Sequence, residues 1–196
     1  MAKMIDFNDV KFVKSVSVDM DFPSPRLNEI LFLGRSNVGK SSIINALTNR
    51  KQLAFVSKKP GHTTLLNYFL INDTFYLVDA PGYGFSARDK NHYKLFAMLM
   101  DNYLKKSNYL RFAIVLLDVR RHVNEDDKLM IDYLIKCQIP FRLIFTKSDL
   151  SNQKERAKAT KMLMDIYNIP KEEIVFTSSN DGRGVETLRN IIQSHL

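Results

Sequence analysis

A glycine-rich segment lies between a short apolar run and an amphipathic stretch, and it matches the pattern G-x-x-x-x-G-K-[ST]. Its eight residues are Gly34, Arg35, Ser36, Asn37, Val38, Gly39, Lys40 and Ser41. The two glycines permit a tight turn whose N–H groups, together with the N-terminus of the next helix, stabilise phosphate oxygens. Lys40 would bring a mobile positive charge to the β- and γ-phosphates, and the Ser41 hydroxyl would bind Mg²⁺. The segment therefore predicts a phosphate loop; the alternative is a chance glycine turn before a helix.

A carboxylate ends a later apolar run, in the segment Asp79-Ala80-Pro81-Gly82. From the end of a strand Asp79 can reach Mg²⁺ through a water molecule, and Gly82 lets a backbone N–H approach the γ-phosphate. Pro-Gly is also ordinary turn chemistry. Because the segment follows a phosphate loop in the chain, we interpret it as part of the same site.

The loop between these segments contains Lys58-Lys59-Pro60-Gly61-His62-Thr63-Thr64. A loop that senses the γ-phosphate needs a hydroxyl to complete the Mg²⁺ shell, and Thr63 is the first candidate, with Thr64 as its rival. The alternative is a polar surface loop. We expect nucleotide contacts from Gly61, His62, Thr63, Thr64 and Leu65.

A third segment, Thr146-Lys147-Ser148-Asp149, follows another apolar run. A carboxylate at Asp149 can accept hydrogen bonds from the N1–H and 2-amino groups of guanine, and adenine lacks both donors. Lys147 would lay its aliphatic stem over the base. Asn usually begins this motif, so we expect Thr146 to lose a hydrogen bond. Alternatively, Asp149 or Ser151 caps the following helix. Backbone N–H groups that could reach the guanine O6 come from Thr177, Ser178, Ser179 and Asn180.

The elements that must position these residues alternate along the chain. Strand-like apolar runs cover 30–33, 66–71, 75–79, 112–118, 141–146 and 174–177, and helical patterns cover 40–49, 90–105, 125–137, 154–167 and 185–196. This alternation predicts an α/β fold of three layers, with a mainly parallel six-stranded sheet, one antiparallel strand and helices on both faces. Ligands of such sheets bind at the carboxyl ends of the strands, where all three polar segments lie.

The composition of the chain limits the classes of protein to which it can belong. The 196 residues are 45% hydrophobic and 26% charged, which fits one globular domain. A single cysteine, Cys137, excludes a disulfide scaffold, and we predict no membrane span and no leader, hence a cytoplasmic protein. The net charge of +8 favours an anionic partner such as RNA, although a solvated basic face is an alternative.

With these motifs in order, the chain resembles the EngB (YihA/YsxC) family of small bacterial GTPases, of the TRAFAC P-loop class. The resemblance covers nearly the whole chain and includes Phe12-Val13-Lys14-Ser15, Pro60-Gly61-His62-Thr63, Asn67-Tyr68-Phe69, Asp79-Ala80-Pro81-Gly82-Tyr83-Gly84-Phe85 and Asp118-Val119-Arg120. It implies a P-loop GTPase fold, with a single domain over 26–196 and an N-terminal extension over 1–25 that packs on it. It also implies a monomer, with GTP or GDP as ligand and Mg²⁺ held by Ser41, Thr63 and Asp79. The chain departs from the usual family residues at His62, Thr64 and Leu150. It also lacks the tryptophan that the family usually has.

The resemblance further implies a switch in the assembly of the large ribosomal subunit or its precursor, needed for normal cell division and septation. Many GTPases carry a water-positioning Gln where this chain has Tyr83, so we expect slow hydrolysis. The catalytic residues expected are Lys40, Thr63, Gly82 and Asn37, and Asn37 makes stimulation by K⁺ a hypothesis. Two alternatives remain open: a GTPase acting directly in cell division, and a P-loop ATPase or kinase.

Overall fold

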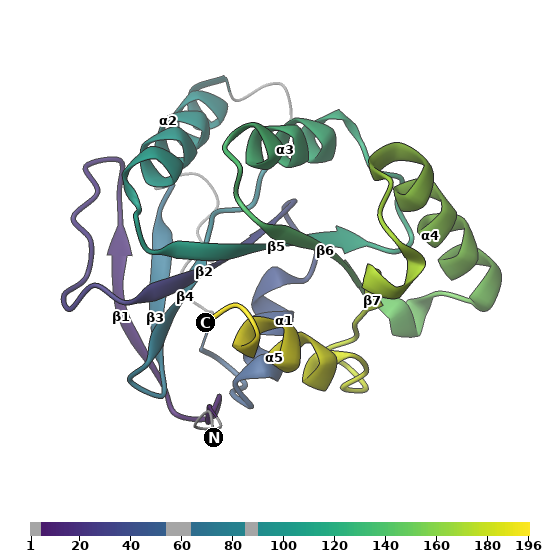
Figure 1. The fold of residues 1–196 in the computed structure, drawn as a ribbon, viewed down its shortest axis with the longest axis horizontal. Helices are drawn as coiled ribbons and strands as arrows, with labels where there is room; N and C mark the ends of the chain where they lie inside the picture. Colours follow the sequence, from purple (N-terminus) through teal and green to yellow (C-terminus); the bar gives the residue numbers. More distant parts are fainter. Residues whose placement is uncertain (1–4, 54–63, 85–89) are drawn as a thin grey trace.

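The computed structural model describes residues 5–53, 64–84 and 90–196 (Figure 1). Within these ranges the strands are β1 (Val10–Val16), β2 (Asn28–Gly34), β3 (Leu66–Ile71), β4 (Phe75–Asp79), β5 (Leu110–Asp118), β6 (Phe141–Thr146) and β7 (Val175–Phe176). The α-helices are α1 (Lys40–Leu47), α2 (Lys90–Lys106), α3 (Glu125–Lys136), α4 (Gln153–Tyr167) and α5 (Val185–Gln193). None of these helices is long and apolar enough to cross a bilayer.

The strands form one sheet in the order β1-β3-β4-β2-β5-β6-β7. The β2, β4, β5, β6 and β7 pairings are parallel, whereas β3 runs antiparallel to both β1 and β4. The predicted α/β class, the mainly parallel sheet and its antiparallel strand are confirmed. The sheet has seven strands rather than six, because Val10–Val16 forms an edge strand on β3.

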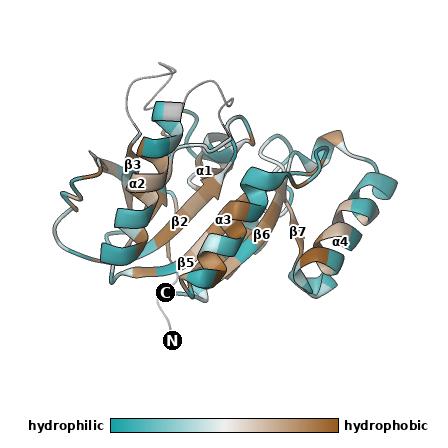
Figure 2. Cartoon of the chain, turned by 90° about the horizontal axis from the view of Figure 1, so that it is seen from above, coloured by the Kyte–Doolittle hydropathy of each residue, from teal (hydrophilic) through white to brown (hydrophobic). Residues whose placement is uncertain are grey.

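Helices cover both faces of the sheet, with α2, α3 and α4 on one side and α1 and α5 on the other (Figure 1). A separate apolar core fills each side. The central strands β2 and β5 contribute alternate residues to both cores, so they are apolar almost throughout, as Figure 2 shows by colour. Because both faces of these strands are buried, the positions of their carboxyl ends, next to the polar segments, are well defined.

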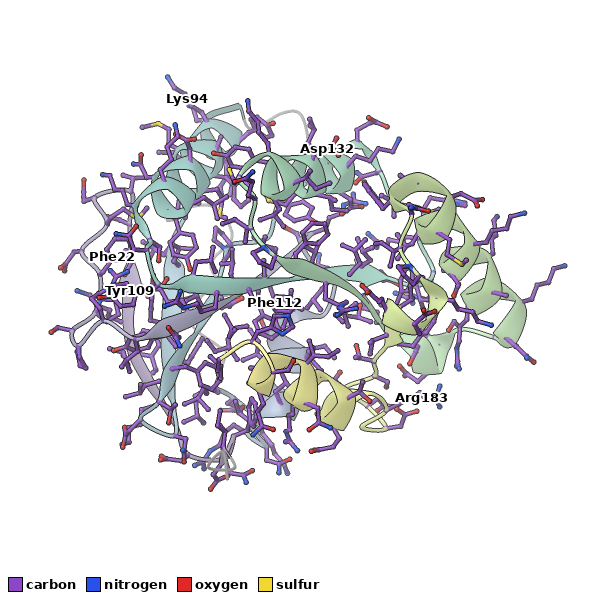
Figure 3. All side chains as sticks on the ribbon, viewed as in Figure 1. Phe22, Lys94, Tyr109, Phe112, Asp132 and Arg183 are labelled. Atoms are coloured by element: carbon purple, nitrogen blue, oxygen red, sulfur yellow. The ribbon has the colours of Figure 1, made fainter. Side chains whose placement is uncertain are left out.

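The end of the sheet away from those segments is held by a buried polar cluster around Glu29. Its carboxylate accepts hydrogen bonds from Tyr103 (2.8 Å) and Ser107 (2.7 Å) and pairs with Arg26 (3.0 Å). The Arg26 guanidinium lies over the rings of Phe22 and Tyr109, which are labelled in Figure 3. Burial raises the pKa of Glu29, although the hydrogen bonds oppose the shift.

Candidate nucleotide-binding site

The predicted phosphate loop joins the end of β2 to the start of α1. Asn37 and Gly39 adopt left-handed backbone conformations, with φ of 64° and 103°. The Val38 N–H donates to the Arg35 carbonyl (3.1 Å), which closes the turn. A Cβ on Gly34 would lie 2.7 Å from Val38 Cγ1, so the loop folds tightly enough to require glycine there. The N-terminal turn of α1 thus starts just beyond the carboxyl end of β2, and the first N–H groups of a helix are free to bind an anion.

Lys40 and Asp79 form an ion pair at this edge, between the Lys40 Nζ and Asp79 Oδ1 atoms. Their side chains are only 11% and 9% exposed. Ser41 follows Lys40 in the first turn of α1. The structure thus brings together the cation expected to bind phosphate, a carboxylate and a hydroxyl.

The Gly82–Tyr83 segment is hydrogen-bonded directly to the phosphate loop. The Ser36 N–H donates to the Tyr83 carbonyl (2.9 Å), and the Tyr83 N–H donates to the Gly34 carbonyl (3.2 Å). A Cβ on Gly82 would lie 2.9 Å from the backbone N and Cα atoms of Ser36. Glycine at this position therefore lets the backbone after β4 pack against the phosphate loop.

The Tyr83 side chain lies inside the protein. It is 5% exposed, and its ring packs 6.2 Å from that of Phe96. Burial raises the pKa of Tyr83 well above its usual value, and the nearby Asp127 carboxylate raises it further. Tyr83 is therefore a neutral phenol packed in the core.

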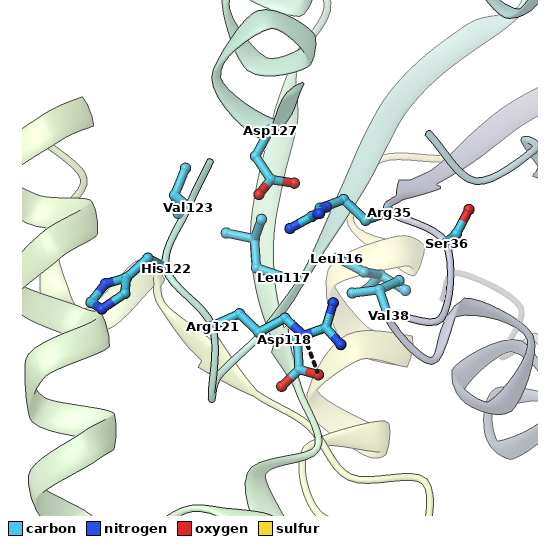
Figure 4. Close-up of a pocket in the computed structure, with 10 residues that line it drawn as sticks. All are labelled: Arg35, Ser36, Val38, Leu116, Leu117, Asp118, Arg121, His122, Val123 and Asp127. Atoms are coloured by element: carbon cyan, nitrogen blue, oxygen red, sulfur yellow. Dashed lines mark ion pairs between the residues drawn. The ribbon is translucent and has the colours of Figure 1, made fainter. Parts of the chain in front are cut away.

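A small pocket lies behind the phosphate loop, between Arg35 and Asp127 of α3 (Figure 4). Asp127 caps α3 reciprocally with Asn124, and its carboxylate also faces the buried Tyr83 hydroxyl. The Ser36 Oγ atom is buried without a hydrogen-bond partner in the described ranges. The pocket walls belong to the phosphate loop, the end of β5 and the start of α3, so they form the back of the predicted site.

Thr146 and Lys147 connect the base-recognition segment to the phosphate loop. The Thr146 hydroxyl donates to the Val38 carbonyl (2.7 Å), and Lys147 Nζ donates to the Asn37 carbonyl (2.7 Å). Thr146 thus makes a buried hydrogen bond to the loop in the place where the motif usually has Asn. The phosphate loop and the β6 end consequently form one unit.

Asp118, at the end of β5, holds Lys147 from its other side. Its carboxylate accepts hydrogen bonds from Lys147 Nζ (3.0 Å) and from Arg120 Nε (3.0 Å) and Nη2 (2.8 Å). Burial acts to raise the pKa of Asp118, but the bonds from Arg120 and Lys147 outweigh it and lower that pKa below its usual value. From the sequence, Asp118 was only part of the family resemblance, and the structure adds its contact with Lys147.

Asp149 lies half-buried in the 3-10 turn Ser148–Leu150. The alternative in which Asp149 or Ser151 caps the next helix is wrong, because Asn152 caps α4 and shares a capping box with Glu155. The Asp149 carboxylate accepts no hydrogen bond from the described part of the chain. It therefore remains available to donors on a ligand.

The segment that was expected to reach the guanine O6 packs beside this turn. The Ser148 N–H donates to the Thr177 carbonyl (3.1 Å), and the N–H groups of Asn180 and Asp181 donate to Ser178 Oγ (3.2 and 3.3 Å). Thr177 and Ser178 are fully buried, whereas Ser179 and Asn180 are exposed. The structure thus brings the two predicted base-binding segments together.

The loop expected to sense the γ-phosphate is described only in part. Residues 61–63, and with them Thr63, lie outside the described residues. Thr64 is buried, and its hydroxyl lies 3.5 Å from His92 Nε2 of α2. Its side chain thus contacts a helix of the protein, and Leu65 beside it is partly buried.

Comparison with known proteins identifies the family. The model of the 50S ribosome-binding GTPase family matches residues 29–147. The probable GTP-binding protein EngB of Thermoanaerobacter pseudethanolicus is 39% identical over 186 residues, which cover 95% of this chain and 97% of that protein. Its counterpart in Thermotoga maritima is 39% identical over 189 residues, 96% of each chain. A crystal structure of a probable GTP-binding protein engB has the same fold, with a TM-score of 0.66 and 22% identity over 85% of this chain and 97% of that one. The chain, with its phosphate loop joined to the turn that carries Asp149, belongs to the EngB family of GTP-binding proteins, which are GTPases of the ribosome-binding type.

Proposed function

We propose that this GTPase hydrolyses GTP slowly and acts as a switch in the assembly of the large ribosomal subunit. The observation that carries the nucleotide part is the pair of hydrogen bonds from Thr146 and Lys147 to the phosphate loop. They hold Lys40 and Asp149 on one edge of the sheet, where one nucleotide can engage both. We further propose that the protein acts as a cytoplasmic monomer.

The residues present suit Mg²⁺ as the accompanying ion. Mg²⁺ prefers hard oxygen ligands and keeps several waters and phosphate oxygens in its shell. Ser41 supplies a hydroxyl, and Asp79 supplies a carboxylate that lies against Lys40. Ser41 would bind the ion directly, Asp79 would hold one of its waters, and Thr63 would complete the shell with GTP bound. When bound, the ion would supply positive charge that offsets the negative charge of the phosphates.

Competition between nucleotides tests this assignment. We expect GDP to displace a fluorescent guanine nucleotide about 100-fold more effectively than ADP, since two hydrogen bonds to a carboxylate separate the bases. The measurement is a displacement titration in excess Mg²⁺. Equal displacement by ADP would contradict guanine recognition and favour a P-loop ATPase or kinase.

Slow hydrolysis follows from the place of Tyr83 in the core. A second charge-stabilising group must then come from a partner or an ion, and Asn37 is the proposed K⁺ ligand. Its side chain is exposed at the phosphate loop and makes no hydrogen bond within the described ranges. Its left-handed backbone offers the competing explanation that Asn37 only shapes the loop.

Two substitutions separate these explanations. We expect GTP hydrolysis to be at least about tenfold faster in K⁺ than in Na⁺, and Asn37→Ala and Asn37→Gly to abolish that difference. Glycine retains the left-handed backbone without a side-chain oxygen. Retention of the K⁺ effect in Asn37→Gly would show that Asn37 is no ligand. A purified protein that turned over GTP rapidly in Na⁺ alone would contradict the proposal of slow hydrolysis.

The basic residues differ in whether they already form ion pairs within the protein or could contact RNA. Lys11 and Lys14 on β1 pair with Asp73 and Asp21. On α4, by contrast, three exposed lysines occur at spacings of four and three residues, which places them on one face of the helix. In the described part of the chain no carboxylate pairs with these three, which are Lys154, Lys158 and Lys161. We call them the α4 lysine stripe and propose that it contacts ribosomal RNA phosphates.

Neutralising the α4 lysine stripe tests this contact. We expect the triple Lys→Gln variant at 154, 158 and 161 to bind the large ribosomal subunit more weakly and to lower the salt slope of binding by about 2. Co-sedimentation over a salt series, with GTP and with GDP, measures both. The control changes Lys106, Lys136 and Lys171, which are exposed but dispersed. Equal effects of the two triple variants would mean that net charge, and no particular surface, governs binding.

A further inference from the structure

Arg156 differs from the other basic residues of α4 because its guanidinium turns inward. Nη2 donates to the carbonyls of Ser148 (2.6 Å) and Ser151 (3.0 Å), and Nε donates to Ser151 Oγ (3.0 Å). In the sequence, Arg156 stands between Lys154 and Lys158. Its three hydrogen bonds place it against the base-recognition turn.

The atoms that Arg156 holds flank Asp149 on both sides. The Ser148 carbonyl precedes Asp149, and Ser151 follows two residues later. The same Ser148 carbonyl also accepts the Ser151 hydroxyl (2.9 Å), which ties the two ends of the turn together. Before the turn, Lys147 adopts a left-handed conformation, with φ of 58°. Arg156 therefore fixes the backbone that carries the Asp149 carboxylate.

Recognition of guanine places a narrow geometric demand on that carboxylate. Its two oxygens must lie in the plane of the base to accept from N1–H and the 2-amino group together. Phosphate binding makes no such demand on this turn, because the phosphate contacts come from the loop before α1. We propose that Arg156 is a positioning residue for guanine specificity, acting through the backbone on either side of Asp149. This inference rests on the proposed role of Asp149.

The test compares nucleotides that differ only in the base. We expect Arg156→Ala to weaken GDP binding about tenfold but inosine diphosphate, which lacks the 2-amino group, only about twofold, and to leave ADP binding unchanged. Arg156→Lys, which keeps the charge without the forked donors, should fall between wild type and alanine. Ser151→Ala, which removes one acceptor, should shift the GDP preference in the same direction by less. Displacement titrations in excess Mg²⁺ give each affinity.

Asp165→Ala, at an exposed position of the same helix, is the matched control and should leave all three affinities unchanged. Thermal unfolding of each variant confirms that it is folded. A wild-type protein that bound ADP as tightly as GDP would overturn the guanine assignment itself. If wild type prefers GDP and Arg156→Ala keeps the same GDP-to-inosine-diphosphate ratio, the role of Arg156 is overturned. An equal loss for all three nucleotides would overturn it as well, because that is the result of a merely structural role.

Discussion

Replacing Lys40 with alanine is expected to weaken GTP binding about 100- to 1,000-fold, since its ammonium would make charge-assisted hydrogen bonds to two phosphates. The same substitution also affects the free protein. It leaves the Asp79 carboxylate, whose side chain is 9% exposed, without its ion-pair partner. Removing one member of a buried pair costs more than removing both, so we expect the free energy of unfolding to fall by about 1–3 kcal/mol.

The double variant Lys40→Ala/Asp79→Asn separates these two consequences. It removes both charges, so we expect it to regain most of the lost stability while GTP binding remains weak. Urea unfolding without nucleotide measures the first quantity, and titration with GTP and Mg²⁺ measures the second. GTP affinity in Lys40→Ala within a few-fold of wild type would contradict the proposed phosphate contact.

The order of the motifs predicted much of the site, because each motif follows a strand and parallel strands end at one edge. Asp79 and Thr146 end β4 and β6, as the apolar runs indicated, and Gly34 ends β2 one residue beyond its run. The local sequence pattern was sufficient here, because each motif and the strand end that it follows lie within a few residues of each other. The helix boundaries of the sequence analysis differ from those observed by a few residues at most.

The features that the sequence did not predict depend on contacts between distant segments or have only weak local patterns. Asp118 and Arg156 each have an ordinary sequence neighbourhood, and their roles arise from Lys147 on another strand end and from the carbonyls of the Ser148 turn. The edge strand Val10–Val16 is mostly exposed or half-exposed and contains two lysines, so it lacks the apolar signal of a buried strand. Its pairing with β3 stabilises the strand, and this pairing cannot be read from the sequence of the strand alone.

One glycine, beside the end of β7, leaves no room for a side chain. Gly184 precedes α5, with a left-handed φ of 70°. A Cβ there would lie 2.2 Å from the Phe176 carbonyl oxygen and 3.1 Å from Thr177 Cγ2. Phe176 ends β7 and Thr177 opens the segment beside the Asp149 turn, so neither can move without displacing the packed strand end. The first residue of α5, Val185, is itself buried in the core.

We therefore expect Gly184→Ala to lower the free energy of unfolding by about 3–5 kcal/mol, the sum of a left-handed alanine and a severe backbone clash. Gly182→Ala is the matched control, because its φ of 76° is equally left-handed but no atom lies within 4 Å of the added Cβ. That variant should lose only about 1 kcal/mol, since it bears the conformational cost alone. Urea unfolding of the two variants measures the difference, which isolates the clash from the backbone strain. Similar losses in both variants would mean that the end of β7 moves to accommodate the methyl group. GDP affinity should then fall in Gly184→Ala, because a displaced Thr177 shifts the segment proposed to reach the guanine O6 atom.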